Sequence, residues 1–340
     1  MTELEPVVEA PATAQPYCLY CTSTKLEPLY TGVRDRLGYV PGERAFLRCT
    51  ECGSAIQDPL PHTEELAGFY PPVYSFTPEL GGKSKFKRFL SAMEYRFFFG
   101  PQYRKQVKQV MRGCNWKDGT GKKLLDVGCG RGLRLLEFRK LGFDVHGLDV
   151  QEDVVRYLND DLKIPARCAD VSAMTAMYEP ASFDIITTYF LIEHIPNVRE
   201  AIANMYALLK PGGWIAAAVP FVDSIQAKWF GKKWINITEV PRHLAVPTQK
   251  GMVDAYAAAG FTNTKIIPDS ALNCAGQFAS SLISGATLTH LYGQNRLVPL
   301  FLRSIGAGVM LASLPWCMLE NFLFSRPVFG VALAQKPLSA

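Results

Sequence analysis

The amino-acid sequence predicts an α/β domain that is built on a mainly parallel sheet. Between about residues 122 and 261, short apolar runs alternate with amphipathic stretches of helical period, which is the pattern of parallel strands joined by crossover helices. The chain has 340 residues, of which 48% are hydrophobic and 20% are charged, and this composition excludes disordered and collagen-like chains. A chain of this length also has room for smaller modules around one large domain.

Seven segments are predicted as strands. Five come before residue 221, and the other two are separated by about sixty residues instead of a hairpin turn. Because a connection that long normally has structure of its own, we expect an apolar helical insertion over residues 270–325. The strand candidates are LLDV (124–127), DVHGLD (144–149), RCADV (167–171), DIITTYF (184–190), WIAAAVP (214–220), TNTKII (262–267) and VFGVALAQ (328–335).

The first predicted strand ends in a glycine-rich turn, LLDVGCGRG, which is followed by a helical stretch. Glycines at a strand-to-helix turn allow positive φ angles and a close approach of the backbone to a ligand, and the helix start offers free N–H groups. The spacing is G-x-G-x-G, and Leu133 occupies the place of the third glycine of the dinucleotide fingerprint. This departure disfavours NAD and FAD as ligands.

Two acidic residues close the next two strands. Asp149 ends the second strand, where a carboxylate can accept hydrogen bonds from both hydroxyls of a ribose. Asp170 ends the third strand, and its side chain together with the backbone of Val171 can read the edge of an adenine. The pattern therefore indicates an adenosine-containing ligand.

Five ordered segments carry a resemblance to a known family. LLDVGCGRG, GLD, CADV, FDIITTYFLIEHIPN and LLKPGGWIAAAVP together resemble the class I S-adenosylmethionine-dependent methyltransferases of types 11, 12 and 23, over about 122–268 and the last strand. The resemblance implies a seven-stranded Rossmann-like sheet in which the antiparallel last strand is inserted beside the fifth. It also implies S-adenosyl-L-methionine as cofactor. The cofactor contacts that it implies are Asp126, Gly128 and Gly130 for the methionine part, Asp149 for the ribose, Asp170 and Val171 for the adenine, and Phe190.

Two pairs of cysteines lie near the N-terminus. Cys18 and Cys21 form one C-x-x-C pair, and Cys49 and Cys52 form the other after 27 intervening residues. Four thiolates as two knuckles suit a closed, structural zinc site, and the alternative is reduced, buried cysteines without a metal. The following stretch, RCTECGSAIQDPLPHTEELAGFYPPVYSF, resembles the linker after the zinc knuckle in bacterial methyltransferases of surface-glycan and sugar-modification gene sets. Five other cysteines, at positions 114, 129, 168, 274 and 317, are expected to be packed thiols.

The acceptor site is expected in the loops beyond the carboxyl ends of the strands. Glu193 and His194 follow the fourth strand, and either a base at His194 or a helix-start histidine bonded to backbone fits the sequence. His243, a second candidate for the catalytic base, lies in EVPRHL, which resembles a D-x-P-R-H-L run of the zinc-knuckle group. Arg242 can bind an anionic substrate or be a surface cation, and Trp234, with Trp229, can stack on a sugar or close the core.

The modest net charge of +5 conceals one strongly basic segment. Residues 83–112 hold nine cations and one acid together with interleaved aromatic residues. This pattern fits a helix on an anionic membrane surface, with the insertion 270–325 as a second contact, or a helix packed on the sheet with a solvated basic face. The most apolar part of the insertion, residues 304–319, is shorter than the about 20 residues of a spanning helix and contains Pro315. A helical lid or a subunit contact is the alternative for it.

The segments give four predicted regions: a mobile N-terminus (1–16), a zinc-knuckle module (17–60), a linker with basic amphipathic helices (61–121) and a methyltransferase domain (122–340). The N-terminus lacks the basic start and apolar core of a secretory signal, so we expect a cytoplasmic protein, peripheral at the inner membrane face. The expected activity is methylation of a hydroxyl, or of a carbon, in a sugar, glycan or lipid-linked intermediate. An RNA methyltransferase with a zinc ribbon and a non-catalytic scaffold are the alternatives, and nucleic acid is the less favoured partner.

Overall fold

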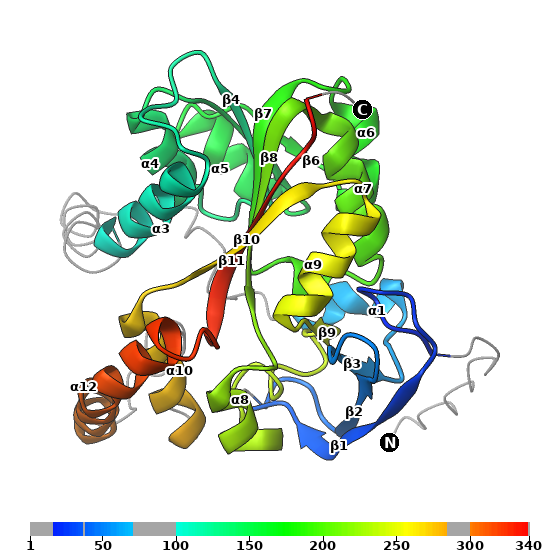
Figure 1. The fold of residues 1–340 in the computed structure, drawn as a ribbon, viewed down its shortest axis with the longest axis vertical. Coiled ribbons are helices and arrows are strands. Elements are labelled where there is room, and N and C mark those ends of the chain that lie inside the picture. The colour runs from blue at the N-terminus through cyan, green and yellow to red at the C-terminus, as the bar shows by residue number, and fades with distance from the viewer. Residues whose placement is uncertain (1–15, 37, 71–99, 284–299, 339–340) are drawn as a thin grey trace, which may run out of the picture.

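The computed structural model describes residues 16–36, 38–70, 100–283 and 300–338. These residues form a large sheet with helices on both faces, a small sheet near the N-terminus, and a pair of helices beside them (Figure 1). Residues 1–15 of the predicted mobile N-terminus and residues 83–99 of the basic segment lie outside the described residues.

The large sheet has seven strands in the order β10-β11-β8-β7-β4-β5-β6. Strand β11 pairs antiparallel with β8 and with β10, and the other pairs are parallel. This arrangement confirms the predicted sheet, with its last strand inserted beside the fifth. The strands are β4 (Lys123–Val127), β5 (Asp144–Asp149), β6 (Ala166–Cys168), β7 (Phe183–Tyr189), β8 (Leu209–Pro220), β10 (Thr262–Pro268) and β11 (Phe329–Gln335).

Alternate residues of the strands face two separate cores. Ile185 and Ala216 belong to the core shared with α3 (Gly100–Gly113), α4 (Leu133–Lys140) and α5 (Glu152–Asp160). Ile186 and Ala217 belong to the core shared with α7 (Val198–Leu208) and α9 (Gln249–Ala258). Because successive side chains of a strand point to opposite faces, these apolar strands are covered on both sides.

Short helical turns link these elements, and several of them border the sites described below. They are α1 (Thr63–Leu66), η1 (Ala67–Phe69), η3 (Val171–Ala173), α6 (Met174–Met177), η4 (Ile192–His194), α8 (Ile225–Phe230) and η5 (Gly231–Lys233). The turn η4 directly follows β7, and η3 follows β6. Both therefore lie at the carboxyl edge of the parallel strands.

The small sheet joins the N-terminal segment to the rest of the chain. Strands β1 (Leu26–Arg34), β2 (Glu43–Cys49) and β3 (Ala55–Asp58) form an antiparallel meander, and β9 (Ala245–Val246) pairs antiparallel with β3. Strand β9 belongs to the connection between β8 and α9, which the sequence places in the methyltransferase region. The two sheets therefore share a core, with Tyr20 and Cys49 in the same cluster as Ile186 of β7.

The insertion between β10 and β11 contains two helices, α10 (Ala271–Leu282) and α12 (Leu300–Phe322). The α12 helix continues through Pro315, although a proline removes one backbone hydrogen bond from a helix. After the proline, the carboxylate of Glu320 accepts hydrogen bonds from the backbone and side chain of Gln226 in α8, at 2.9 and 3.0 Å. These buried contacts hold the second half of the helix in place.

The α12 helix, with 23 residues, is longer than the apolar stretch 304–319 that the sequence analysis compared with a spanning helix. An 18-residue window, Ile305–Phe322, has a mean hydropathy of 1.2 and is long and apolar enough to cross a membrane by length and composition. Only 22% of this window is buried. Among the described residues it is the one helix with these properties.

The described part of the basic segment is α3, and it packs on the large sheet. Its buried residues include Val107 and Val110, which join the core with Val331 and Leu333 of β11. The basic residues at positions 104, 105, 108 and 112 are exposed. For α3, the structure therefore agrees with the second interpretation of the basic segment, a helix packed on the sheet with a solvated basic face.

Candidate functional site

The glycine turn after β4 has a backbone that a side chain would strain. Gly128, Gly130 and Gly132 have φ angles of 70°, 48° and 66°, in the left-handed region that favours glycine. A Cβ atom at Gly128 would lie 3.0 Å from the side chain of Leu191, so this loop approaches the turn closely. The turn thus needs glycine for both its conformation and its packing.

Asp149 at the end of β5 fastens this turn. Its Oδ2 atom accepts a hydrogen bond from the Gly130 N–H at 2.9 Å, and its Oδ1 atom accepts one from the Gln151 N–H at 3.1 Å. Burial raises the pKa of Asp149 above its ordinary value, and these two hydrogen bonds oppose that rise. Asp170 is exposed and caps η3, which begins at Val171. It accepts hydrogen bonds from the backbone N–H and the hydroxyl of Ser172.

Asp126 lies almost fully buried at the other side of the turn. Its Oδ1 atom accepts a hydrogen bond from the Thr187 hydroxyl at 2.7 Å, and burial raises the pKa of its carboxyl to about 6. The positive charge of Arg134 lowers this pKa. The Arg134 guanidinium lies 4.1 Å from the ring centre of Tyr189 and 4.8 Å from that of Tyr103. A carboxylate and a guanidinium therefore lie beside the same turn.

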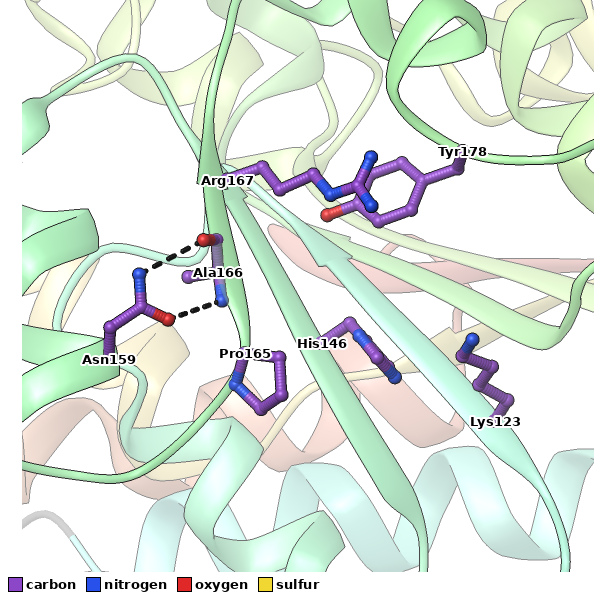
Figure 2. A pocket seen from close by; sticks show the side chains of 7 residues that line it. All are labelled: Lys123, His146, Asn159, Pro165, Ala166, Arg167 and Tyr178. Atoms are coloured by element: carbon purple, nitrogen blue, oxygen red, sulfur yellow. Dashed lines mark hydrogen bonds between the residues drawn. The ribbon is translucent and has the colours of Figure 1, made fainter.

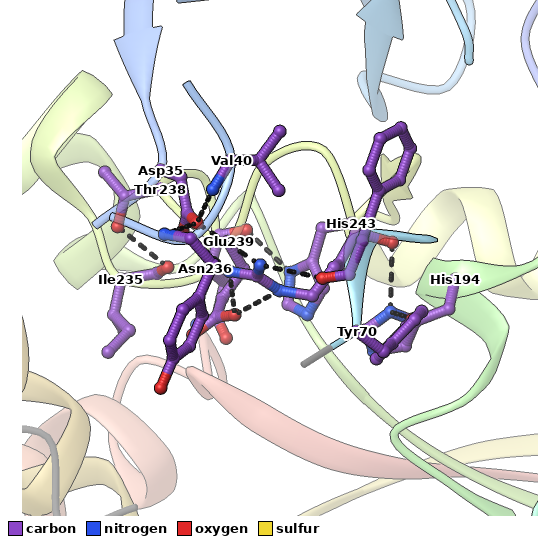
Figure 3. A network of polar contacts seen from close by, with 12 residues as sticks. Asp35, Val40, Tyr70, His194, Ile235, Asn236, Thr238, Glu239 and His243 are labelled. Carbon is purple, nitrogen blue, oxygen red and sulfur yellow. Dashed lines mark hydrogen bonds and ion pairs between the residues drawn. The ribbon is translucent and has the colours of Figure 1, made fainter. Parts of the chain in front are cut away.

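Glu193 and His194 of η4 lie close to His243, which belongs to the loop after β8. One potential ligand atom from each lies within 4.8 Å of the other two, and the centres of the two imidazole rings are 4.6 Å apart. The Nδ1 atom of His194 lies 3.0 Å from the carbonyl oxygen of Arg242 and 3.0 Å from the Tyr70 hydroxyl. The Nδ1 atom of His243 lies 2.7 Å from the carbonyl oxygen of Asn236 (Figure 3).

Burial dominates the electrostatics of this cluster. It raises the pKa of Glu193 to about 8 and lowers the pKa of His194 to about 4. It also lowers the pKa of His243 well below the ordinary value, and the neighbouring His194 adds to that effect. The Oε2 atom of Glu193 is buried and has no hydrogen-bond partner among the described residues. Each of these environments disfavours the charged form of the side chain.

Arg242 is completely buried and is not a surface cation. Its Nη2 atom lies 2.6 Å from Oδ1 of Asp35 and 3.2 Å from Oε2 of Glu239, and Figure 3 labels both acids. Asp35 follows strand β1 of the small sheet, 207 residues away in the sequence. The carboxylate at Glu239, where an aspartate is more usual in the resembling group, still reaches the arginine.

The predicted acceptor-site tryptophans and the predicted cofactor contact Phe190 have different surroundings. Trp234 is fully buried in a core with Phe46 of the small sheet, so this side chain closes the core. Trp229 is 57% exposed and stacks on Trp316 of α12 with 4.4 Å between the ring centres. Phe190 has a φ of 57° and packs edge to face against Phe329.

The four N-terminal cysteines form a compact cluster. The sulfur atoms of Cys18 and Cys52 are 3.5 Å apart, as are those of Cys21 and Cys49, and all four lie within 4.8 Å of one another. Tetrahedral zinc with bonds of about 2.3 Å to sulfur places neighbouring sulfurs about 3.8 Å apart. The residues present therefore fit a tetrahedral metal site. Of the five other cysteines, Cys168 is exposed, which corrects its prediction as a packed thiol, and the rest are buried.

Figure 2 shows a hollow of about 220 Å³ whose lining includes no residue of either cluster. It is bordered by residues such as Lys123 at the start of β4 and Ala166 at the start of β6. Ligands of parallel sheets bind beyond the carboxyl ends of the strands, whereas this hollow lies near the opposite ends. We do not assign the cofactor to it.

Comparison with known proteins places this geometry in a family. A family model described as a methyltransferase domain matches residues 102–266. These residues belong to the class I S-adenosylmethionine-dependent methyltransferases. The matched range begins inside α3 and ends within β10.

Curated relatives of the methyltransferase domain carry one recurring name. Ubiquinone biosynthesis O-methyltransferase of Paraburkholderia phymatum is 35% identical over 100 residues, which cover 28% of this chain and 43% of the relative. The protein of the same name from Coxiella burnetii is 39% identical over 98 residues, or 27% and 41% of the two chains. The chain thus spans less than half the length of these relatives. A solved SAM-dependent methyltransferase from Archaeoglobus fulgidus is 18% identical, with a TM-score of 0.46 and coverage of 73% and 100%.

Several residues around the methyltransferase site were not singled out from the sequence. Arg134 carries a signal, because it follows Gly132 by two positions in the turn-to-helix segment. Tyr70 and Asp35 carry none, since they reach His194 and Arg242 from segments 124 and 207 residues away. Their roles depend on the packing of the small sheet against the loop after β8.

Proposed function

We propose that this chain transfers a methyl group from S-adenosyl-L-methionine to a hydroxyl oxygen of a sugar, glycan or lipid-linked intermediate. The observation that carries the proposal is the hydrogen bond from the Gly130 N–H to Asp149, which fixes the turn of the family's cofactor site. A hydroxyl is favoured over a carbon as the acceptor because the curated relatives are named O-methyltransferases.

The residues around the turn fit the cofactor part by part. S-adenosylmethionine supplies an electrophilic methyl group on a sulfonium. Asp149 would receive the ribose hydroxyls, and Asp170 with Val171 would border the adenine. At the amino-acid end, the carboxylate of Asp126 and the guanidinium of Arg134 offer opposite charges for the ammonium and carboxylate groups of the cofactor. Gly128 would let the backbone approach the cofactor closely. A side chain at this position would be strained at a φ of 70° and would meet Leu191.

The acceptor would lie beyond the carboxyl end of β7, next to Glu193 and His194. Displacement at a methyl carbon needs alignment of the two reactants and removal of the hydroxyl proton. His243 reaches the same place from the loop after β8. These three residues are the groups that we assign to the acceptor side. The buried Arg242 would position this loop through Asp35 instead of binding the substrate itself.

The cysteine cluster is proposed as a structural zinc site. Cys18, Cys21, Cys49 and Cys52 would fill all four positions of a tetrahedral ion and leave none for substrate. The site would tie the N-terminal strand segment to the core shared by the two sheets. Its contribution would be to folding, since such sites couple metal binding to stability.

Peripheral contact with the cytoplasmic face of a membrane is a further part of the proposal. The end of α12 and the residues after it expose Phe322, Leu323 and Phe324, with 70%, 68% and 45% of their surfaces accessible. Exposed apolar patches of this kind mark interaction surfaces, and a lipid-linked acceptor would be reached at such a surface.

One experiment addresses the acceptor directly. Cell extract would be incubated with the protein and S-adenosylmethionine labelled in its methyl group, and the lipid, glycan and RNA fractions would then be counted. We expect label in the lipid or glycan fraction, stable to mild base as an ether is. Label in RNA would support an RNA methyltransferase instead. The absence of transfer by a protein that binds the cofactor would favour a scaffold.

A further inference from the structure

We infer that Glu193, His194 and His243 form a binding site for a divalent transition-metal ion, separate from the cysteine cluster. One potential ligand atom from each side chain lies within 4.8 Å of the other two. Bonds of about 2.1 Å to nitrogen or oxygen place two ligands of one ion at most about 4.2 Å apart, so a small closing movement completes the site. Two imidazoles and one carboxylate suit ions from Mn²⁺ to Zn²⁺.

The hydrogen bonds of the two histidines engage Nδ1 and leave Nε2 of each ring available. Both Nδ1 atoms face backbone carbonyl oxygens, that of Arg242 for His194 and that of Asn236 for His243. A carbonyl oxygen only accepts, so each Nδ1 carries the proton and donates it. Each neutral ring then keeps a lone pair on Nε2. This is the tautomer in which histidine ligates metals, with a backbone partner that orients the ring.

The carboxylate provides the second, independent observation. Glu193 is 1% exposed, and its Oε2 atom has no hydrogen-bond partner among the described residues. A buried, unpartnered carboxylate oxygen is costly, and a cation at this place would satisfy it. The nearby cation Arg242 is held by Asp35 and Glu239, so its charge is already balanced.

The proposed ion would differ from the cysteine-bound zinc in its open coordination. Three protein ligands leave at least one position free, whereas four thiolates close the sphere. An oxygen of the acceptor could then occupy that position, and coordination to a cation lowers the pKa of a hydroxyl. This use of the site rests on the proposed methyl transfer, but the binding of the ion does not.

Metal content separates the two sites. The full chain, loaded with Zn²⁺ and freed of excess ion by gel filtration, would be measured by plasma mass spectrometry. We expect two equivalents for the unaltered protein and one for Glu193→Gln and for His243→Ala. The matched controls are Glu137→Gln, at another buried carboxylate, and His146→Ala, at another partly buried histidine, and both should keep two equivalents.

A second measurement covers variants that fail to fold. Titration with Co²⁺ of the unaltered protein holding one equivalent of Zn²⁺, which fills the cysteine site, should give visible absorption bands typical of nitrogen and oxygen ligands, without the intense thiolate bands of a cysteine site. One equivalent of metal in the unaltered protein and no such cobalt bands would overturn the inference. Binding of S-adenosylmethionine by calorimetry is recorded in parallel. Metal binding without cofactor binding would sustain this site and reject the proposed methyl transfer.

Discussion

Arg242 and Asp35 form an ion pair with 2.6 Å between Nη2 and Oδ1, and both side chains are completely shielded from solvent. The pair joins the loop that carries His243 to the end of strand β1 in the small sheet. Desolvated pairs of this kind are expensive to break, because removal of one partner leaves an uncompensated buried charge. The acceptor-side loop and the small sheet are therefore coupled.

Asp35→Ala should lower the free energy of unfolding by up to about 3–5 kcal/mol, since it removes the closer of two carboxylates from the buried Arg242 and leaves Glu239 at 3.2 Å. The matched control is Glu43→Ala, which removes the partner of Arg34 in a pair that is also 2.6 Å long but well exposed. That change should cost less than about 1 kcal/mol. Urea unfolding measures both, and equal losses in the two variants would contradict the role given to the buried pair.

Gly128→Ala should weaken the binding of S-adenosylmethionine by at least about tenfold, which corresponds to about 1.4 kcal/mol. The new Cβ atom would meet Leu191 at 3.0 Å and would hold a φ of 70°. Gly121→Ala is the control, because Gly121 has a φ of 74° but no neighbour within 4 Å of an added Cβ. It imposes similar strain on the fold away from the site and should leave the affinity unchanged. Calorimetric titration of both variants compares them.

Much of this architecture is predictable from local sequence, and the reason is physical. A parallel strand buried on both faces is a short apolar run between turns, so the central strands β4, β7 and β8 stand out, and β5 coincides with its predicted range 144–149. The two-residue strand β9 has no such signature. It exists because Ala245 and Val246 meet an open edge of the small sheet.

The candidate site divides in the same way. Gly128 and Asp149 lie at the ends of two successive strands, in short segments whose residues indicate an adenosine ligand without knowledge of the packing. His194 and His243 were each singled out, but their contact depends on the packing of two loops. The α12 helix continues through Pro315, because Cys317 and Glu320 beyond it pack on α8 and α10. Long-range packing overrode the local preference there.

Asp126→Asn should stabilise the fold more at pH 7.5 than at pH 4. Burial raises the pKa of this carboxyl from 3.8 to about 6, so the folded state resists its ionisation. The resulting cost is absent below about pH 4 and complete above about pH 6, where it reaches up to about 3 kcal/mol. The asparagine carries no such cost and keeps an acceptor for the Thr187 hydroxyl. Denaturant unfolding at the two pH values measures the difference, and a gain that does not change with pH would refute this origin.

Cys49→Ser should remove the cysteine-bound zinc and lower thermal stability, because three thiolates hold the ion less tightly than four. The control Cys168→Ser replaces an exposed cysteine outside the cluster and should change neither quantity. Metal analysis and thermal unfolding with and without a chelator give the readout. A chain that is equally stable without zinc would argue for plain buried thiols.

Leu323→Asp should reduce co-sedimentation with liposomes of anionic phospholipid, since it places a charge on the exposed apolar end of the α12 region. Leu338→Asp makes the same change at another exposed leucine, with 82% accessibility against 68% for Leu323, and should sediment as the unaltered protein does. Equal sedimentation of all three proteins would remove this surface from the membrane proposal.

Calorimetric titration of the full chain with S-adenosylmethionine, with and without Asp149→Ala, tests the central claim most directly. The account predicts one site in the unaltered protein and a loss of affinity of at least about tenfold in the variant, because a charged acceptor of hydrogen bonds contributes about 1.5–3 kcal/mol. Asp160→Ala, at an exposed carboxylate of α5, should bind normally. No binding by the folded protein, or equal affinity in the Asp149 variant, would contradict the account.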